Sequence, residues 1–379
     1  MHPMIKPALR RAWRDRQTVQ YGVAPAHAVL LGPVDNTTAS FMELLDGTRS
    51  LVRLRKEAAG LGLAPGTADR LVDRLASAGV LDDATADRQA SASVSDRLRP
   101  DLGSLSVVHP EPGGGLRRLV ARRDACVQVR GAGRVGSLVA STLSAAGVGE
   151  VDVVDGGHVE CWDTIPGGIP PEESGARRDV AARKAVCRAK PWHSRSRSRG
   201  SVAGRGAAGG RGGVGLVVLA PRDGLDAYAP DPAAAEGFVQ TGTPHLYGGV
   251  VESTGVVGPL VLPGVSPCAG CLLHGRAERE PSWPLVVGQW RTSARRRSGV
   301  PACDAALATM VAGAVSSYAL SFLDGDGDCA AGHRMRFSLP HLMGDTEQFS
   351  PHPECPCGAA SVTAGRPHSA DVAEEATMA

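Results

Sequence analysis

The sequence lacks a strong excess of charge of either sign, because 41 Lys and Arg residues stand against 39 Asp and Glu and leave a net charge of +2 over 379 residues. General binding to nucleic acid or to an acidic membrane surface needs a basic field that this chain does not have. We therefore expect no nucleic-acid partner and no membrane association, and the partners have to be inferred from local sites.

Long hydrophobic runs are also scarce. The N-terminal stretch MHPMIKPALRRAW has no apolar core of the kind that a signal peptide needs, which predicts a cytoplasmic protein. The mostly apolar run at residues 306–323 approaches the length of a membrane span, but it contains two adjacent serines and sits between Asp304 and the acidic stretch DGDGD. This composition favours a buried helix.

A disulfide framework is not expected either. In a reducing compartment, close pairs among the nine cysteines are first interpreted as metal ligands. Cys268 and Cys271 form a C-x-x-C pair, and Cys355 and Cys357 form a C-x-C pair. Four thiolates can surround Zn²⁺ and leave no position for water, which predicts a structural zinc site. His352 is an alternative to one thiolate, and a degenerate set of unpaired thiols is the alternative to a metal. The other cysteines stand alone: Cys126, Cys161, Cys187, Cys303 and Cys329.

What the sequence does contain begins with a compact pattern over residues 1–83. The stretches TVQYGV and HAVLLG alternate like the strands of a hairpin, and NTTASFMELLDG has Asn36 or Thr37 in position to cap a helix. Residues 66–83 then repeat apolar side chains at helical spacing. These elements predict a small winged-helix-like domain, followed by a polar linker at 84–115, for which a surface helix is the alternative.

A larger α/β domain is expected over residues 116–358. CVQVR, VDVVD and GLVVLAP are short apolar runs typical of buried parallel strands, and helix-compatible sequence separates them. Residues 193–213 are rich in Arg, Ser and Gly and predict a disordered insertion, because they cannot bury enough apolar surface to fold. An RNA-contacting tract is the alternative, although interleaved aromatics are absent. The tail at 359–379 is expected to be flexible.

The stretch VQVRGAGRVGSLVASTLSAAGVGEVDVVDGGHV reads as a strand, a glycine-rich turn, a helix and a second strand that ends in an aspartate. Gly131, Gly133 and Gly136 have the G-x-G-x-x-G spacing, which permits a tight turn, a close approach of backbone to phosphate, and close packing of helix on strand. The helix N-terminus favours an anion there. Asp155 follows where a carboxylate can accept hydrogen bonds from ribose hydroxyls. This context predicts a bound nucleotide; glycines that serve packing alone are the alternative.

The GAGRVG turn, the AAGVGEVDVVDGGHV segment and the two late cysteine pairs together resemble the ThiF/MoeB/ubiquitin-activating superfamily. The resemblance includes VPACDAALATMVAGAVSSYAL, which is similar to the family's cysteine followed by a buried helix. It implies a Rossmann-like ThiF-type domain at 116–358 that binds ATP and adenylates the C-terminal carboxylate of a small ubiquitin-like protein or a peptide. Residues 1–83 resemble the PqqD-like peptide-recognition module, which implies capture of a precursor peptide.

The resemblance also implies roles for single residues. Asp155 corresponds to the family's ribose-binding aspartate, and Asp223 to the aspartate that holds Mg²⁺ near the phosphates. Arg178 stands where the family has a phosphate-contacting lysine, and it replaces a point charge with a planar fork. Two positions depart from the pattern: Asp163 replaces an asparagine, and Pro166 replaces an arginine.

These departures matter because adenylation builds negative charge on the α-phosphate, and the loss of an arginine clamp typically costs a few kcal/mol of stabilisation. Asp163 is expected to repel the phosphates. Arg177, Arg178, Arg183 or a partner subunit could supply the missing charge. Cys303 lies near the position where some family members keep a thioester-forming or persulfide-carrying cysteine, and a buried thiol on a helix is the alternative.

The leading hypothesis is therefore a ThiF-like adenylyltransferase that uses ATP and Mg²⁺ and contains a structural Zn²⁺. The first alternative is a catalytically degenerate protein whose N-terminal module captures a leader peptide and whose nucleotide domain is a scaffold for a separate enzyme. A Rossmann oxidoreductase is a weaker alternative, because no convincing set of hydride-handling residues is present. A homodimer is left open.

Overall fold

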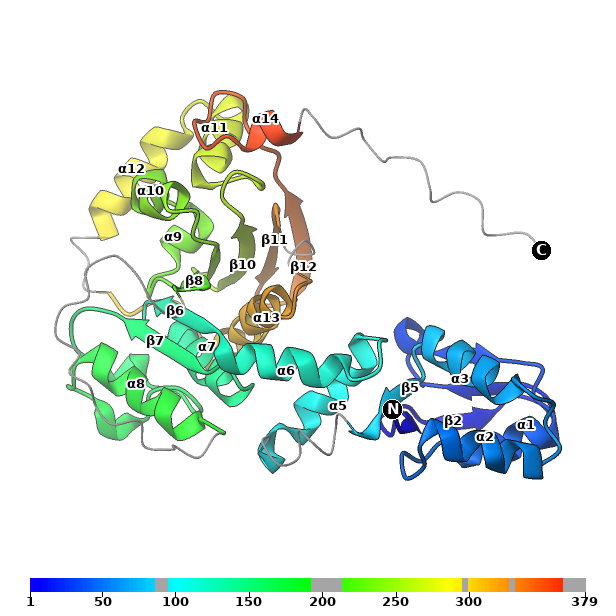
Figure 1. Ribbon diagram of the computed structural model, residues 1–379. Helices are drawn as coiled ribbons and strands as arrows, with labels where there is room; N and C mark the ends of the chain where they lie inside the picture. The colour runs from blue at the N-terminus through cyan, green and yellow to red at the C-terminus, as the bar shows by residue number, and fades with distance from the viewer. Residues whose placement is uncertain (86–94, 192–212, 295–298, 327–330, 364–379) are drawn as a thin grey trace. The chain divides into compact units, whose positions relative to one another are not determined.

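The computed structural model describes residues 1–85, 95–191, 213–294, 299–326 and 331–363, which form two compact units (Figure 1). The first unit is Met1–Asp124, and the second contains Ala125–Lys190 and the described residues from 213 onward. The insertion expected at 193–213 lies outside the described residues except for Gly213, as do Cys329 and most of the predicted tail.

The first unit begins with two small antiparallel sheets. One pairs β1 (Pro3–Ile5) with β5 (Leu81–Asp83), and the other has the strand order β2-β3-β4. The remaining elements are β2 (Arg11–Trp13), β3 (Val19–Tyr21), η1 (Pro25–His27), β4 (Val29–Leu31), α1 (Asn36–Glu43), α2 (Leu51–Gly60) and α3 (Thr67–Ser77). The antiparallel pairing of β3 with β4 confirms the predicted hairpin. Tyr21, Phe41 and Leu54 are fully buried in the core between these elements.

The cap of α1 differs from the prediction. Asp35, and not Asn36 or Thr37, precedes the helix in an extended conformation, and its carboxylate accepts a hydrogen bond from the Thr38 N–H at 2.7 Å. Asp is a strong N-cap because its short side chain satisfies an N–H that the helix leaves unpaired. The prediction found the helix but chose the wrong capping residue.

Residues 95–124 belong to the first unit, in contrast to the polar linker expected at 84–115. They form η2 (Asp96–Leu98), α5 (Arg99–Val108) and α6 (Gly114–Asp124). Lys6 is fully buried, and its Nζ donates to the carbonyl oxygens of Ser106 at 2.5 Å and His109 at 3.2 Å. These carbonyls lie at the C-terminal end of α5, where a cation is favoured. One buried lysine therefore fastens α5 to β1.

The second unit is built on a seven-stranded sheet with the order β12-β11-β10-β9-β8-β6-β7. Its strands are β6 (Cys126–Arg130), β7 (Glu150–Val154), β8 (Leu216–Leu219), β9 (His245–Val251), β10 (Thr254–Val261), β11 (His333–Ser338) and β12 (Met343–Gln348). The parallel pairing of β7, β6 and β8 confirms the three strands predicted from short apolar runs. β9 continues the parallel part, and β10 to β12 add an antiparallel part that the sequence analysis missed. The α/β fold class is confirmed.

Helices cover this sheet, and the longest of them packs on it closely. They are α7 (Arg134–Ala145), α8 (Arg178–Ala189), α9 (Leu225–Tyr228), α10 (Pro232–Gln240), α11 (Ala269–Arg279), α12 (Trp283–Ala294), α13 (Ala305–Leu323) and α14 (Ala359–Thr363), with 3₁₀ turns at Cys161–Asp163 and Pro171–Glu173. Of the helices described, α13 alone is long and apolar enough to cross a membrane, and its buried side chains join the main hydrophobic core. A Cβ on Gly248 or Gly255 would lie within 2.4 Å of a methyl of Val315 or Val311, so glycine admits this helix to the sheet. The last helix, α14, lies within the predicted flexible tail, and its Ala359 is fully buried.

Candidate functional site

The glycine-rich turn joins β6 to α7 at the carboxyl end of the parallel strands. Gly131 has a φ of +105°, and a Cβ there would lie 1.9 Å from the carbonyl oxygen of Ala220, just beyond β8. A Cβ on Gly136 would lie 2.0 Å from the carbonyl oxygen of Gly131. Gly133 is the N-cap of α7 and provides no side-chain cap. The first N–H groups of α7 therefore have no acceptor within the helix and are available to an anion at the turn.

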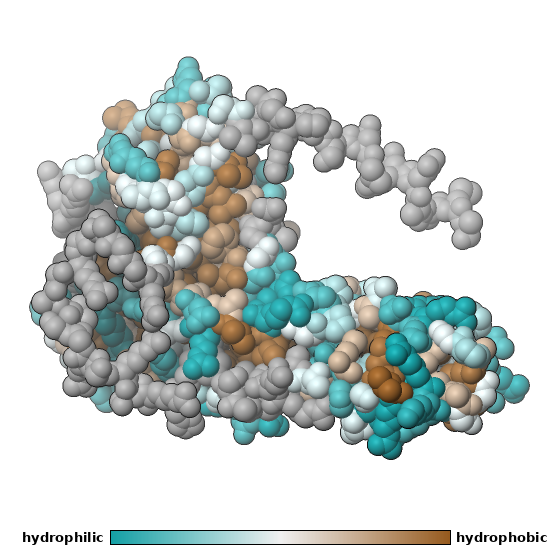
Figure 2. All heavy atoms as spheres, in the orientation of Figure 1, coloured by the Kyte–Doolittle hydropathy of each residue, from teal (hydrophilic) through white to brown (hydrophobic). Residues whose placement is uncertain are grey.

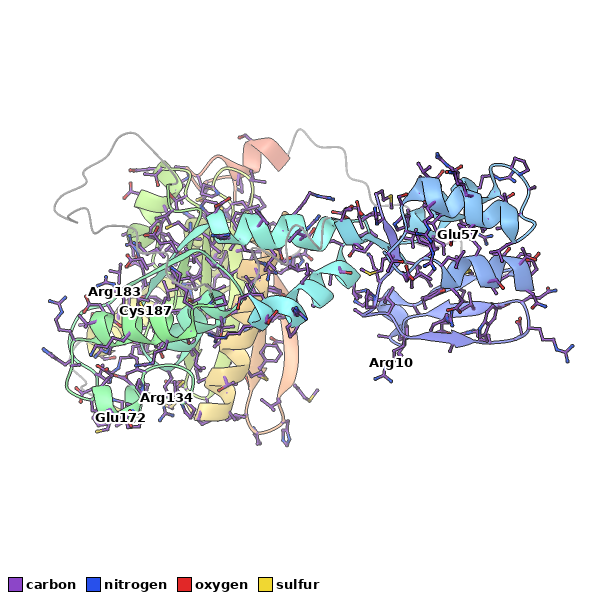
Figure 3. All side chains as sticks on the ribbon, turned by 60° about the horizontal axis from the view of Figure 1, so that its bottom comes forward. Arg10, Glu57, Arg134, Glu172, Arg183 and Cys187 are labelled. Carbon is purple, nitrogen blue, oxygen red and sulfur yellow. The ribbon has the colours of Figure 1, made fainter. Side chains whose placement is uncertain are left out.

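A pocket lies beside this turn, and its lining includes Arg134, Trp162, Asp163 and Arg222. Three N–H donors in the lining are buried and have no hydrogen-bond partner among the described residues: Nε of Arg134, Nε1 of Trp162 and Nη2 of Arg222. Arg134 is the first residue of α7 and is labelled in Figure 3. Because an unsatisfied buried donor is costly, three of them around one pocket indicate a ligand rich in acceptor oxygens.

Asp163 is buried, with its side chain 2% exposed, and it lies between two arginines. Its Oδ1 accepts a hydrogen bond from Nε of Arg222 at 2.6 Å, and its Oδ2 lies 3.3 Å from Nε of Arg178. Oδ2 also accepts from the Glu160 backbone N–H at 3.0 Å. Two guanidinium groups therefore balance the charge that was expected to repel phosphates, and the repulsion predicted from this substitution is correspondingly smaller.

Asp155 follows β7, and both of its carboxylate oxygens are engaged. Oδ2 accepts from the Ala132 N–H at 2.5 Å, and Oδ1 accepts from Nη1 of Arg178 at 3.0 Å. Arg178 donates in addition to the carbonyl oxygens of Gly156 and His158. Each carboxylate oxygen has a further lone pair, so Asp155 can still accept from a ribose hydroxyl. Arg178, however, is held by these acceptors and does not line the pocket.

Asp223, Arg177 and Arg183 also lie outside the pocket lining. Asp223 is exposed in the turn after β8, where its carboxylate accepts from the Leu225 N–H at 3.1 Å. Arg177 and Arg183 both pair with Asp179, and Arg183 projects from α8 (Figure 3). Of the three arginines proposed as replacements at the phosphates, only Arg178 reaches the carboxylates of Asp155 and Asp163 beside the turn.

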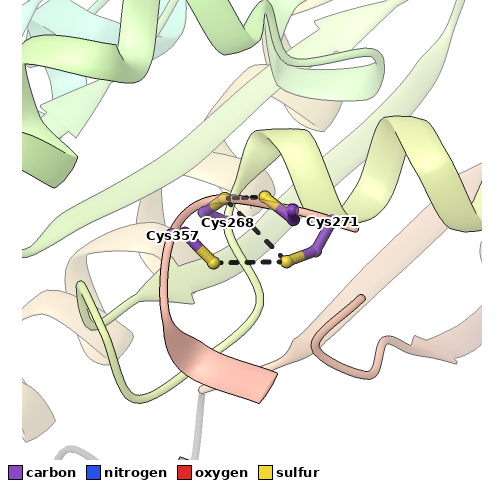
Figure 4. A group of neighbouring side chains, drawn as sticks. Cys268, Cys271 and Cys357 are labelled. Atoms are coloured by element: carbon purple, nitrogen blue, oxygen red, sulfur yellow. Dashed lines mark hydrogen bonds between the residues drawn. The ribbon is translucent and has the colours of Figure 1, made fainter. Parts of the chain in front are cut away.

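The four cysteines of the two predicted pairs come together (Figure 4). Cys268 is the N-cap of α11 and Cys271 lies in its first turn, whereas Cys355 and Cys357 come from the loop before α14. The sulfur of Cys268 is 3.9 Å from that of Cys271 and 3.5 Å from that of Cys355, and the sulfurs of Cys271 and Cys357 are 3.5 Å apart. Zn–S bonds of about 2.3 Å in a tetrahedron place sulfurs about 3.8 Å apart. The cluster therefore fits a closed four-sulfur zinc site.

The surroundings of the cluster favour a thiolate and separate His352 from it. The Cys268 thiol donates to the Cys271 sulfur and, with the backbone N–H of His352, lowers the pKa of the Cys271 thiol, whereas burial raises the pKa of the Cys355 thiol. The His352 ring stacks on His274, and its Nε2 lies 2.9 Å from a carboxylate oxygen of Glu278. The geometry thus favours the C-x-C thiols over the imidazole as ligands.

Cys303 lines the pocket two residues before α13, not on the helix as expected. Its carbonyl oxygen accepts from Nη1 of Arg134 at 2.8 Å, and burial raises the pKa of its thiol to about 11. A thiol with a raised pKa is a poor nucleophile at neutral pH. The isolated cysteines Cys161 and Cys187 are exposed, and Cys187 lies on α8 (Figure 3).

The sequence model of the ThiF family matches residues 114–357, which is more than half of the chain. The chain belongs to the ThiF family. Solved structures agree on the fold of this ThiF-family protein. E. coli MccB with ATP is similar over 94% of this chain and 99% of its own, with a TM-score of 0.67 and 11% identity. No match was found among curated proteins.

Two further structures show the same fold. The microcin C7 biosynthetic enzyme MccB in complex with N-formylated MccA has a TM-score of 0.66 and 12% identity, covering 94% of this chain and 100% of its own. The heterocyclase TruD has a TM-score of 0.58 and 16% identity, covering 96% of this chain and 43% of its own. At such low identity these likenesses establish the architecture of the ThiF-family chain and leave the role of each residue to its own geometry.

The sequence analysis missed the three residues that offer unpaired donors to the pocket. Arg134 occupies a variable position inside the G-x-G-x-x-G spacing, and Arg222 stands directly before the aspartate that drew attention at Asp223. Trp162 lies in the stretch CWDTIPGGIPP, next to the departure from the family pattern at Asp163. The sequence offered one indication of these donors: Arg134 lies within the glycine turn, and Trp162 and Arg222 stand directly before Asp163 and Asp223.

Proposed function

We propose that this ThiF-family protein is an ATP-dependent adenylyltransferase that acts on the carboxylate of a peptide or small protein. The observation that supports this most directly is the pocket beside the glycine turn. Three buried donors without partners and the N-terminus of α7 face one space there. An anion with many acceptor oxygens would satisfy all of them, and the triphosphate of ATP is such a group. MccB, which has the same fold, has been solved with ATP.

In the proposed reaction a carboxylate oxygen attacks the α-phosphorus of ATP. The bond from that phosphorus to the oxygen bridging to the β-phosphate breaks, pyrophosphate leaves, and an acyl adenylate forms. The turn from Gly131 to Gly136 holds the phosphates, and Asp155 accepts from the ribose. Asp223 has carboxylate capacity left for Mg²⁺, whose preferred ligands are such oxygens. Arg178 contacts a phosphate only after it turns away from Asp155.

The N-terminal unit supplies the proposed peptide site by strand addition. β4 is an outer strand of its sheet, and no described strand pairs with its other edge, so that edge can pair with an extended peptide. Arg74 of α3 donates to the Gly32 carbonyl after β4, and α1 is tied to β2 by the Arg11–Glu43 ion pair. Figure 2 shows small hydrophobic patches within a largely hydrophilic face of this unit. Leu30 of β4 is 52% exposed. We therefore propose that the peptide adds to the free edge of β4.

We also propose that the cysteine cluster holds a structural Zn²⁺. Four sulfurs within 4.8 Å of one another can surround one ion and leave no open position, so the metal would supply folding free energy and no chemistry. It joins the start of α11 to the loop near the end of the described chain. A link between segments so far apart in the sequence removes much freedom from the unfolded chain.

A second candidate function is a degenerate nucleotide domain that serves as a scaffold for a peptide-modifying enzyme. The Arg178–Asp155 ion pair favours it, because Arg178 then stabilises the fold where a nucleotide would otherwise bind. In this case the peptide site of the N-terminal unit is retained, and ATP is not consumed.

Exchange of labelled pyrophosphate into ATP separates the two candidates. The full-length protein, with Mg²⁺ and precursor peptides encoded by neighbouring genes, should catalyse this exchange if it forms an acyl adenylate. If calorimetry finds no ATP binding at millimolar concentration, the adenylyltransferase proposal is wrong and the scaffold remains as the candidate function. The Asp155→Ala variant is the matched control, because the fold should survive while exchange falls.

A further inference from the structure

Arg222 is placed so that it can take part in phosphate binding. Its side chain crosses the glycine turn, since a Cβ on Gly133 would lie 3.2 Å from Cγ of Arg222. Both residues line the same pocket, together with the N-terminal residue of α7. The guanidinium of Arg222 therefore lies at the end of the helix where an anion is already favoured.

Arg222 has one paired donor and one buried donor without a partner among the described residues. Its Nε donates to Oδ1 of Asp163 at 2.6 Å, which orients the planar fork. Its Nη2 is buried and has no acceptor among the described residues. Nη2 carries two N–H groups and can donate to an oxygen ligand, and the unpaired donors of Arg134 and Trp162 border the same pocket.

The pairing of Asp163 with two arginines explains why its charged carboxylate can be buried. It is 2% exposed and receives Arg222 on one oxygen and Arg178 on the other. A buried carboxylate is tolerated when it is paired and hydrogen-bonded. Asp163 accepts from Nε of Arg222, whose own side chain is only partly buried, and so orients its guanidinium.

We propose that Arg222 is a phosphate-contacting residue of the nucleotide pocket and that Asp163 is its positioning residue. This inference rests on the proposed adenylyltransferase function and deepens it. It assigns to Asp163 a supporting role where the sequence suggested repulsion. Pro166 cannot supply the positive charge of the arginine that it replaces. The proposal assigns that charge to Arg222, on the turn after β8.

The test compares ATP with adenosine, which lacks the phosphates, by calorimetry on the full-length protein. Arg222→Gln should raise the Kd for ATP about 10- to 100-fold, because a charge-assisted hydrogen bond is lost, and should leave adenosine binding unchanged. Arg222→Lys should recover part of the loss, since it keeps the charge without the fork. Arg177→Gln is the matched control: Arg177 is 68% exposed, pairs with Asp179 and does not line the pocket.

The positioning role is tested by combining Asp163→Asn with Arg222→Gln. If Asp163 acts through Arg222, the change in ATP affinity caused by Asp163→Asn should be smaller in the Arg222→Gln background than in the wild type. An equal change in both backgrounds would overturn the positioning role. Melting temperatures of all variants show whether the fold is kept.

The outcomes distinguish this inference from the proposed function. If the wild type binds ATP and Arg222→Gln binds it equally well, the inference fails and the adenylyltransferase stands. If Arg222→Gln weakens ATP and adenosine alike, the residue supports the fold and the inference also fails. If the wild type binds no ATP, the proposed function is overturned and the inference with it.

Discussion

The cysteine cluster and the glycine-turn pocket are two sites of the same unit that relate differently to the sequence. In the cluster, the four residues singled out by spacing are the four whose sulfurs meet. In the pocket, the turn has the expected geometry, but the unpaired donors belong to residues that no motif indicated. Of the residues chosen by correspondence, Asp155 and Arg178 pair with each other.

The difference follows from what each site requires. A closed metal site needs particular ligand atoms at bond distance, so residue type and close spacing carry most of the information. An anion pocket needs positive charge and N–H donors within a few ångströms, and long arginine side chains can deliver these from several loops. The charge changes at Asp163 and Pro166 can therefore be compensated by arginines from other parts of the pocket, outside the motif.

The largest effect is expected at the cluster. Cys268→Ser should abolish stoichiometric zinc and lower the melting temperature by roughly 10 °C or more, because a structural metal contributes several kcal/mol and each corresponds to about 2–4 °C in a protein of this size. Elemental analysis and calorimetry measure the two results. Cys187→Ser, at an exposed isolated cysteine, is the control. Wild-type protein that carries less than about a tenth of an equivalent of zinc would break the comparison.

The assignment of ligands sharpens the same comparison. His352→Ala should retain zinc, because its ring is engaged with Glu278 and His274 outside the sulfur group. Cys355→Ser should lose the metal. The reverse pattern would keep the metal and show that the C-x-C thiols were the wrong choice.

At the glycine turn, Gly136→Ala should destabilise the protein by about 1–3 kcal/mol and abolish ATP binding. The added methyl would lie 2.0 Å from the carbonyl oxygen of Gly131, so the turn must move. Denaturant unfolding and calorimetry measure both effects. Gly288→Ala in α12 is matched to it, since a Cβ there meets nothing within 4 Å. Unaltered ATP affinity in Gly136→Ala would mean that the nucleotide lies elsewhere.

A smaller effect is expected at the carboxylate that follows β7. Asp155→Ala should weaken ATP binding about 10- to 100-fold while circular dichroism stays native, because hydrogen bonds to ribose are lost. Asp152→Ala serves as the control, since Asp152 pairs with Arg183 at a partly exposed site. If Asp155→Ala instead tightens ATP binding, the freed Arg178 is the stronger phosphate ligand.

The smallest effect concerns the pocket thiol. Burial raises the pKa of Cys303 to about 11, so its thiolate fraction is about 1 in 1,000 at pH 8 and rises with pH up to that value. Its alkylation by iodoacetamide, followed by peptide mass spectrometry, should therefore be slow at pH 8 and accelerate as the pH increases, while exposed Cys187 reacts early. Fast labelling of Cys303 at pH 7 would restore it as a candidate nucleophile.

Much of the second unit could be predicted from local sequence. Short apolar runs identified β6, β7 and β8, and the apolar stretch at 306–323 identified α13. The antiparallel part of the sheet was missed because β11 and β12 are mostly polar and follow no apolar pattern; β11 is partly buried and β12 is largely exposed. In the first unit, local sequence gave no signal for the packing of α5, because Lys6 bonds the Ser106 carbonyl from 100 residues away in the sequence.

The sequence by itself determined the glycine turn, the position of Asp155 at a strand end and the two cysteine pairs whose sulfurs meet, because each depends on residue type and short spacing. The tertiary structure alone decided that Asp163 is balanced by arginines and that Arg222 enters the pocket. Asp163 and Arg222 are 59 residues apart and meet only because β8 packs beside β6 and carries the following turn to the glycines. Charge pairing of this kind depends on distance in space, which no local pattern records.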